Sequence, residues 1–236
     1  MTSSGTKTTN TTPLLFTPKK IRELTIRNRI IASPMCQYLS HDGGPNDWHM
    51  MHLGRLAIGG CGIVFGEETA VEPNGRKTHA CAGLYKTSHV AAYRTLTDMI
   101  KKHGATPAIQ LGHSGRKGSC HGAMEDWRPL DETDAANGLP PWQVMTPTAE
   151  ISPPRPIPHK EMDQADINQV INDFRTATKL SIDAGYDIAE IHGAHGYLIH
   201  QFLSSASNQR QDSYGGSLEN RMRFAIEIAI AVRDLW

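Results

Sequence analysis

Runs typical of buried β-strands alternate with amphipathic helical segments along most of this chain, and this alternation restricts the fold more than any other feature. The four strand-like runs are NRIIASPM, IVFGE, ATPAIQL and YDIAEIH, which begin at residues 28, 63, 105 and 186. Strands that are separated by helices and short turns are typical of parallel βα units. The sequence therefore predicts an α/β fold with a parallel sheet.

The helical segments between these runs have recognisable ends. We expect a first helix over residues 50–57 and a second helix whose N-cap is Ser88. A stripe of residues at helical spacing, from Ile167 to Ser181, predicts a third helix, which Gly185 ends. Ser217 is expected to open a last helix, apolar on almost all sides, that continues to the end of the chain.

Two segments depart from this pattern. Residues 1–13 are polar and have no apolar signal-peptide core, so we expect a flexible tail and assign the folded domain to residues 14–236. Residues 112–160, after the third strand, are rich in Gly, Pro and polar residues. This is a long excursion, and long ordered loops in compact domains are usually functional.

Charge and cysteine content exclude several classes of partner and location. The 24 Lys and Arg residues balance the 24 Asp and Glu residues, so no net field attracts nucleic acid or an acidic membrane surface. The longest apolar stretch, LAIGGCGIVFG, is too short to span a bilayer. The scattered cysteines indicate reduced thiols in a cytoplasmic protein; they are Cys36, Cys61, Cys81 and Cys120.

Polar clusters follow each of the four strand-like runs. They occupy residues 34–38, 67–68, 110–116 and 192–197. When βα units close into a barrel, the loops at the C-terminal ends of the strands meet on one rim and carry the chemistry. We therefore expect all four clusters to converge on one site that binds a small, roughly neutral molecule.

The last cluster contains His192, His195 and Tyr197. Two neutral imidazoles three residues apart in a turn can both donate N–H groups to one carbonyl oxygen that gains negative charge, and a nearby phenol can deliver a proton. His200 raises the alternative of a metal site, but the segment has no H-E-x-x-H pattern and no carboxylate at a ligand spacing. We therefore expect no metal site. No Rossmann glycine pattern follows the first strand, so the sequence does not support a dinucleotide site of that type.

Three segments resemble the old yellow enzymes, the FMN-dependent ene-reductases. They are SPMCQY, AIQLGHSGRK and EIHGAHGYLIHQFLSSASNQRQDSYGGSLENRMRF. The first two are most similar to the thermophilic-like branch of that family. The resemblance implies a (β/α)8 barrel of the TIM-barrel type with FMN across its mouth. About four βα units are present, which is half of such a barrel.

The resemblance also implies roles for individual residues. The loop against the flavin is matched by Ser33, Pro34, Met35 and Cys36, with Cys36 tuning the flavin's redox behaviour. Gln110 matches the contact to the flavin pyrimidine, and Tyr38 a residue of the substrate pocket. His192 and His195 match the pair that holds the substrate carbonyl oxygen, and Tyr197 matches the proton donor. The implied activity is reduction of the activated C=C bond of an enone or enal, with NAD(P)H as the source of hydride.

Two departures from the family pattern lead to further expectations. Glu68 stands near the flavin where the family has a small residue, and its carboxylate is expected to crowd or repel the ring. The phosphate-binding loops of such barrels follow strands seven and eight, beyond the four units counted, so flavin is expected to bind weakly. The open edges of a half-barrel further predict a homo-oligomer.

Two alternatives to this activity remain open. A flavin-free protein could use His192, His195 and Tyr197 for acid–base isomerisation of a conjugated carbonyl compound. The chain could also be an inactive truncated homologue.

Overall fold

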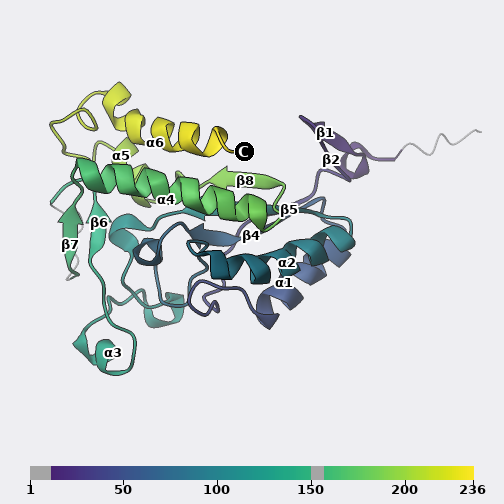
Figure 1. Cartoon of the computed structure of the whole chain (residues 1–236), viewed down its shortest axis with the longest axis horizontal. Coiled ribbons are helices and arrows are strands. Elements are labelled where there is room, and N and C mark those ends of the chain that lie inside the picture. Colours follow the sequence, from purple (N-terminus) through teal and green to yellow (C-terminus); the bar gives the residue numbers. More distant parts are fainter. Residues whose placement is uncertain (1–11, 150–156) are drawn as a thin grey trace, which may run out of the picture.

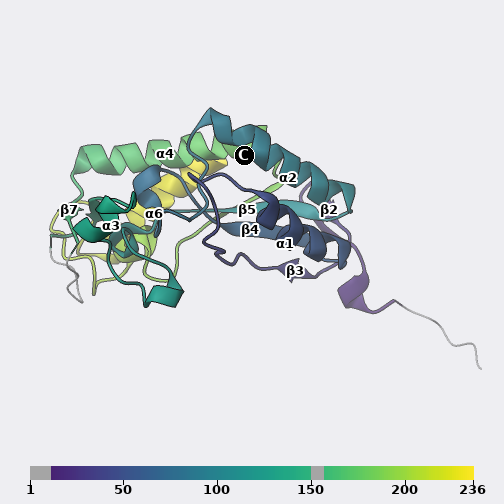
Figure 2. The same cartoon turned by 90° about the horizontal axis from the view of Figure 1, so that it is seen from below.

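A four-stranded parallel sheet forms the centre of the protein, for which we analysed a computed structural model that describes residues 12–149 and 157–236. The tail expected over residues 1–13 lies almost entirely outside the described residues. The strands stand side by side in chain order; Figure 1 labels the last three of them and Figure 2 the first. They are β3 (Ile31–Ala32), β4 (Ile63–Ala70), β5 (Thr106–Gly112) and β8 (Ile188–Ile191). The predicted parallel βα arrangement is confirmed.

Side chains alternate between the two faces of this sheet. On β5, Ile109 and Leu111 pack into the large core formed with the following helices, whereas Ala108 belongs to a small cluster on the opposite face. On β8, Ala189 packs on the large core and Ile188 on the small cluster. This second face corresponds to the interior of a barrel.

The helices that follow the strands pack on one another in chain order (Figure 2). Phe174 of the third and Phe224 of the fourth are fully buried in the large core. The helices are α1 (Asp47–Ile58), α2 (Val90–Lys102), α4 (Gln164–Asp183) and α6 (Leu218–Arg233). This succession is the arrangement of the outer helices in a partial TIM barrel.

Two of the predicted helix starts need correction. The first helix begins three residues earlier than expected, because the side chain of Asn46 accepts a hydrogen bond from Trp48 N and forms a capping box with His49. Ser88 does not cap α2: it lies in a 3-10 helix, η3 (Thr87–His89), which leads directly into α2 without a side-chain cap. The prediction at Ser217 is confirmed, because its hydroxyl accepts from Asn220 N.

An N-terminal hairpin that sequence patterns did not predict closes one end of the sheet. It consists of β1 (Lys19–Ile21) and β2 (Leu24–Ile26), which are antiparallel. Ile26 is buried against Ile63 and Phe65 of β4. These contacts are at the start of β4, so the hairpin lies at the end of the sheet opposite to the polar clusters.

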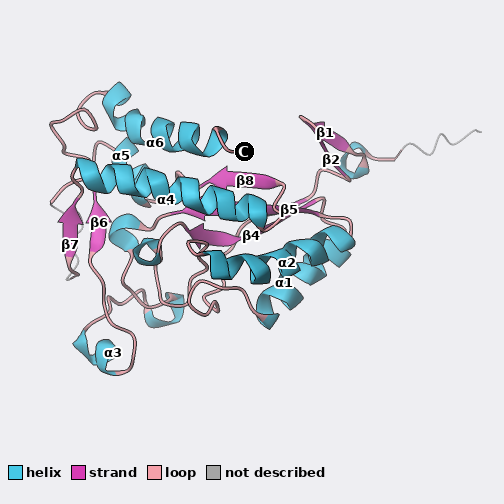
Figure 3. Cartoon of the chain, in the orientation of Figure 1, coloured by secondary structure: helices cyan, strands magenta, loops and turns pink. Residues whose placement is uncertain are grey.

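The long excursion after β5 contains more regular structure than its composition indicates (Figure 3). It holds a short helix, α3 (Glu132–Ala136), and a two-stranded parallel sheet of β6 (Val144–Thr146) and β7 (His159–Glu161).

The segment after β8 was expected to be only loop, but it forms α5 (Leu198–Leu203), whose Phe202 is fully buried. The remaining short elements are the 3-10 helices η1 (Leu14–Phe16), η2 (Pro73–Gly75), η4 (Gly115–Lys117) and η5 (Ala123–Glu125).

The last strand and the last helix leave apolar surface uncovered. Each residue of β4 and β5 is buried, whereas β8 is partly exposed along its length. On α6 the outward side chains at a spacing of four are exposed; they are Leu218, Met222, Ile226 and Ile230.

Among the residues described, we find no helix that combines the length and the apolar character of a membrane span.

Candidate functional site

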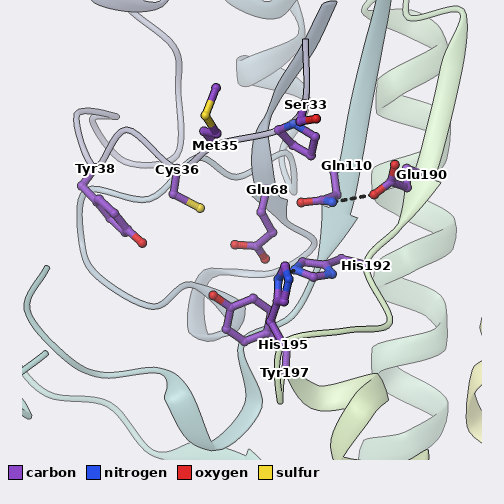
Figure 4. Close-up of a pocket in the computed structure, with 11 residues that line it drawn as sticks. Ser33, Met35, Cys36, Tyr38, Glu68, Gln110, Glu190, His192, His195 and Tyr197 are labelled. Carbon is purple, nitrogen blue, oxygen red and sulfur yellow. Dashed lines mark hydrogen bonds between the residues drawn. The ribbon is translucent and has the colours of Figure 1, made fainter. Parts of the chain in front are cut away.

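A pocket of about 580 Å³ opens at the C-terminal ends of the four parallel strands (Figure 4). Its volume falls in the range of about 300–1,000 Å³ that is typical of small-molecule sites. The structure brings together all the residues to which the family resemblance gave a place at this site, whereas Glu67 of the second polar cluster does not line it. The lining is Ser33, Pro34, Met35, Cys36, Tyr38, Glu68, Gln110, Glu190, His192, His195 and Tyr197.

A β-bulge in β4 sets the direction of two adjacent carboxylates. The register between β4 and β5 shifts between Phe65 and Glu68, so that three steps along β4 match two steps along β5. A bulge of this kind re-aims side chains near a site. Glu67 turns away from the pocket to His49, with 2.9 Å between Oε1 and Nε2, while Glu68 lines the pocket.

His192 and His195 hydrogen-bond to each other in the pocket. His192 Nε2 lies 3.2 Å from His195 Nδ1, and the Ala194 N–H donates to His192 Nδ1 at 3.4 Å. This pattern fits a neutral His192 with its proton on Nε2, which donates to His195. Burial lowers the pKa of His192, which favours the neutral form. A ligand oxygen that displaces His195 from this hydrogen bond would accept a hydrogen bond from the Nε2–H of His192.

The backbone at His195 is in the left-handed region, with φ of 56°, and Gly196 follows with φ of 74°. A non-glycine residue adopts this conformation at an energetic cost, and such residues cluster at functional sites. The turn brings the His195 ring edge-on to His192, with 4.9 Å between ring centroids. The strained turn thus places both imidazoles on one point of the pocket.

Tyr197 packs edge-on against the His192 ring, with a centroid distance of 4.9 Å. Burial raises the pKa of its phenol, and the charge of Lys77 opposes this effect. The phenol therefore stays protonated at neutral pH, as a proton donor must. Its place beside the two imidazoles is compatible with protonating a molecule that they hold.

Glu190 is a pocket residue that sequence reasoning missed. Gln110 Nε2 donates to Glu190 Oε1 at 2.6 Å, which turns the amide oxygen of Gln110 away from the carboxylate (Figure 4). Period-two alternation along YDIAEIH could have found it, because Glu190 shares the inner face of β8 with Ile188 and His192 follows two residues later.

The sequence led us to expect an isolated negative charge at Glu68. The structure shows instead that this carboxylate is paired. Its Oε2 lies 2.7 Å from Nζ of Lys77, and both side chains are 3% exposed. Sequence patterns gave no signal for Lys77, which comes from the loop after η2. The ion pair neutralises most of the repulsion that a bare carboxylate would exert on a bound ring, although the bulk of the side chain remains in the pocket.

The third histidine of the sequence cluster plays no part in the pocket. His200 lies on α5 and is exposed, and it is not among the lining residues. Within residues 12–149 and 157–236, no group of three or more His, Cys, Asp or Glu side chains is arranged to hold a metal ion.

Comparison with known proteins identifies the family to which this fold and pocket belong. The sequence profile of the NADH:flavin oxidoreductase / NADH oxidase family matches residues 14–235. The chain belongs to this family. It is 41% identical over 225 residues to an NADPH dehydrogenase of a Geobacillus species, and 40% identical over 233 residues to an NADH:flavin oxidoreductase of Gibberella zeae. These alignments cover 94% and 98% of this chain.

Solved structures of the family share the fold. The chain superposes on an old yellow enzyme from a Pichia species with a TM-score of 0.81 and 25% identity, over 94% of this chain. Morphinone reductase in complex with tetrahydroNAD gives a TM-score of 0.79 and 27% identity over 95%. The resemblance to old yellow enzymes and the partial TIM barrel are confirmed. The chain spans 60% and 55% of the two sequence relatives, and 56% and 61% of the two structures.

Proposed function

We propose that this protein is an FMN-dependent oxidoreductase that reduces the activated C=C bond of an enone or enal with electrons from NAD(P)H. The convergence of His192, His195, Tyr197 and Gln110 in one pocket carries this proposal. The names of its relatives support a nicotinamide coenzyme and a flavin, and they include both NADPH and NADH.

The chemistry of the pocket fits the ring of a flavin. The loop from Ser33 to Cys36 forms one wall, and Met35 and Pro34 offer apolar surface to a flat ring. Gln110, held by Glu190, presents an amide oxygen that can accept a ring N–H. These residues would hold the ring, and FMN, when bound, would supply the two-electron chemistry. Among the described residues we assign none to its phosphate.

The side chains of the chain itself would handle the charge and the proton. His192 and His195 would donate to the carbonyl oxygen of the substrate and stabilise the negative charge that develops there. A donor in this role contributes about 2.7–4 kcal/mol to lowering the barrier. Tyr197 would give its proton to the α-carbon, and Tyr38 would contact the substrate. Each of these roles requires the ring and the substrate to share this pocket.

Titration of the purified protein with FMN tests this proposal, with Tyr197→Phe as the decisive variant. We expect a flavin spectrum perturbed by binding, and bleaching on addition of NADPH or NADH. Mixing the reduced protein with cyclohexenone should restore the oxidised spectrum. Tyr197→Phe should slow only this second step, by about 10²-fold or more, because only that step needs a proton on carbon. Equal slowing of both steps would contradict the role of Tyr197, and turnover of a conjugated ketone without FMN would favour the isomerase.

We also propose that the chain associates with a second copy through its open sheet and helix surfaces. The partly exposed β8 edge and the exposed stripe on α6 support this proposal, because apolar surface of this kind marks interfaces. A cytoplasmic location is our further proposal, supported by four cysteines that no disulfide joins.

Light scattering coupled to size exclusion tests the association. We expect a mass above that of the monomer, and we expect Ile226→Lys/Ile230→Lys to raise the dissociation constant at least about tenfold, since burial of each isoleucine contributes about 1.5–3 kcal/mol. Met124→Lys is the matched control, because Met124 is an apolar residue that is 98% exposed but belongs to η5 and not to β8 or α6. A parent chain that stays monomeric at every concentration would contradict the proposal.

A further inference from the structure

A buried ammonium group lies beneath the pocket, beside the residue proposed as the proton donor. Lys77 follows η2, and its side chain is 3% exposed. Burial of an ammonium ion costs several kcal/mol unless it is well paired. Its Nζ is 2.7 Å from Oε2 of Glu68, so this carboxylate keeps the ammonium charged. Burial acts to lower the pKa of Lys77, but the charge of Glu68 raises it well above its usual value.

The ammonium lies between three weak acids of the pocket. It is 3.0 Å from Sγ of Cys36, 5.0 Å from the ring centroid of Tyr197 and 5.7 Å from that of Tyr38. Burial raises the pKa of the Tyr197 phenol, and the charge of Lys77 acts to lower it. Burial raises the pKa of the Cys36 thiol to about 11, so that the thiol stays protonated beside the ammonium.

Tyr197 is the member of this group for which a neighbouring cation changes the proposed chemistry. A phenol that gives its proton to carbon becomes a phenolate, and in a buried site this anion is costly unless a positive charge faces it. The charged and titratable groups around Tyr197 are Cys36, Tyr38, Glu68, Lys77, Lys117, His192 and His195. Lys117 donates to the carbonyl oxygen of His195, at 2.6 Å, and approaches the Tyr197 ring to 5.5 Å.

We propose that Lys77, kept charged by Glu68, is a positioning residue that orients the Tyr197 phenol and stabilises the phenolate left after proton transfer. In that step the O–H bond of Tyr197 breaks and a C–H bond forms at the α-carbon of the substrate. The electron pair of the O–H bond stays on the phenolate oxygen, opposite the ammonium, until water returns a proton. This inference rests on the proposed function for the identity of the step, but the coupling between Lys77 and Tyr197 can be measured without flavin or substrate.

The coupling is measured by placing difluorotyrosine at position 197 of the full chain and following its ionisation by fluorine NMR. Lys77→Met alone leaves a buried carboxylate that can unfold the protein, so the main variant is Glu68→Gln/Lys77→Met, which removes both charges together. We expect the titration midpoint of the probe to move to higher pH in this variant, because the loss of the Lys77 charge, which lowers the pKa of the phenol, outweighs the loss of the Glu68 charge, which raises it. Lys77→Arg, which keeps the charge, should retain most of the parent's behaviour.

Lys101→Met provides the matched control, because Lys101 also pairs with a carboxylate, Asp187 at 2.9 Å, but does not line the pocket. The difluorotyrosine at position 197 of this control should titrate at the same pH as in the parent chain. A midpoint in the neutral-pair variant equal to that of the parent overturns the proposal, as does an equal shift in Lys101→Met.

A second readout follows the two half-reactions of the FMN-loaded protein. The neutral-pair variant should slow enone reduction about tenfold, less than the roughly 10²-fold or more that a general acid itself contributes. Flavin reduction by NADPH is measured in the same variant, because Glu68 lines the pocket, and it should be slowed less than enone reduction. Failure to bind FMN would overturn the proposed function, whereas the fluorine titration would still decide whether Lys77 acts on Tyr197.

Discussion

Replacement of Lys77 by Met is expected to lower the free energy of unfolding by about 3–5 kcal/mol, the usual cost of breaking one buried ion pair. The reason is the carboxylate that stays behind. Glu68 is 3% exposed, and within the described residues its Oε1 has no hydrogen-bond partner. Lys77 therefore supplies the main compensation for the buried charge of Glu68, through the 2.7 Å contact to Oε2. Urea unfolding followed by circular dichroism measures the change at a fixed protein concentration.

The combined variant Glu68→Gln/Lys77→Met should recover most of this loss, because no buried charge is left unpaired. Lys101→Met is again the control: its partner Asp187 is about one-third exposed, so we expect a change within about 1 kcal/mol. If Lys77→Met costs no more than Lys101→Met, the buried pair does not stabilise the fold in the way we describe.

The sequence was sufficient to predict all but one of the side chains that line the pocket, the exception being Glu190. Strand order and parallel direction follow from the alternation of elements, and parallel strands necessarily present their C-terminal ends on one edge. Residues as distant in the chain as Cys36, Gln110 and His192 could therefore be assigned to one rim. The identities of the residues, read with the family resemblance, then led to their expected roles, which remain predictions.

What the sequence did not reveal depends on contacts between segments. Lys77 reaches Glu68 only because the loop after η2 folds back over β4, and no spacing rule encodes that path. Ser88 carries a capping side chain, but a 3-10 turn before α2 takes up the position where it would cap. The N-terminal hairpin is short, and its burial at Ile26 exists only because β4 is present to cover it. Local propensity is a weak prior wherever tertiary contacts decide the outcome.

The variant His192→Ala/His195→Ala is expected to weaken binding of a phenolate ligand to the FMN-loaded protein by more than roughly 10²-fold. A phenolate oxygen resembles the enolate oxygen that the proposed reaction creates, and each hydrogen bond to a charged group contributes about 1.5–3 kcal/mol. Two such bonds amount to about 3 kcal/mol or more, and each 1.4 kcal/mol is a factor of ten. The loss of a long-wavelength charge-transfer absorbance on titration with a phenol measures the effect.

The two single variants should differ, because the two imidazoles are not equivalent in the structure. The Ala194 N–H holds His192 Nδ1 as an acceptor, so His192 already carries its proton on the nitrogen that faces the ligand. His195 receives the mutual hydrogen bond on Nδ1, at 3.2 Å, so the neutral ring carries its proton on Nε2 and must reorient or change tautomer before it donates to the same ligand oxygen. His192→Ala should therefore weaken binding more than His195→Ala. His200→Ala is the control within the same segment, since this exposed residue does not line the pocket. Phenol affinity that is unchanged in the double variant would exclude the role of the pair, and a larger loss with His195→Ala would reverse the assignment of the fixed donor.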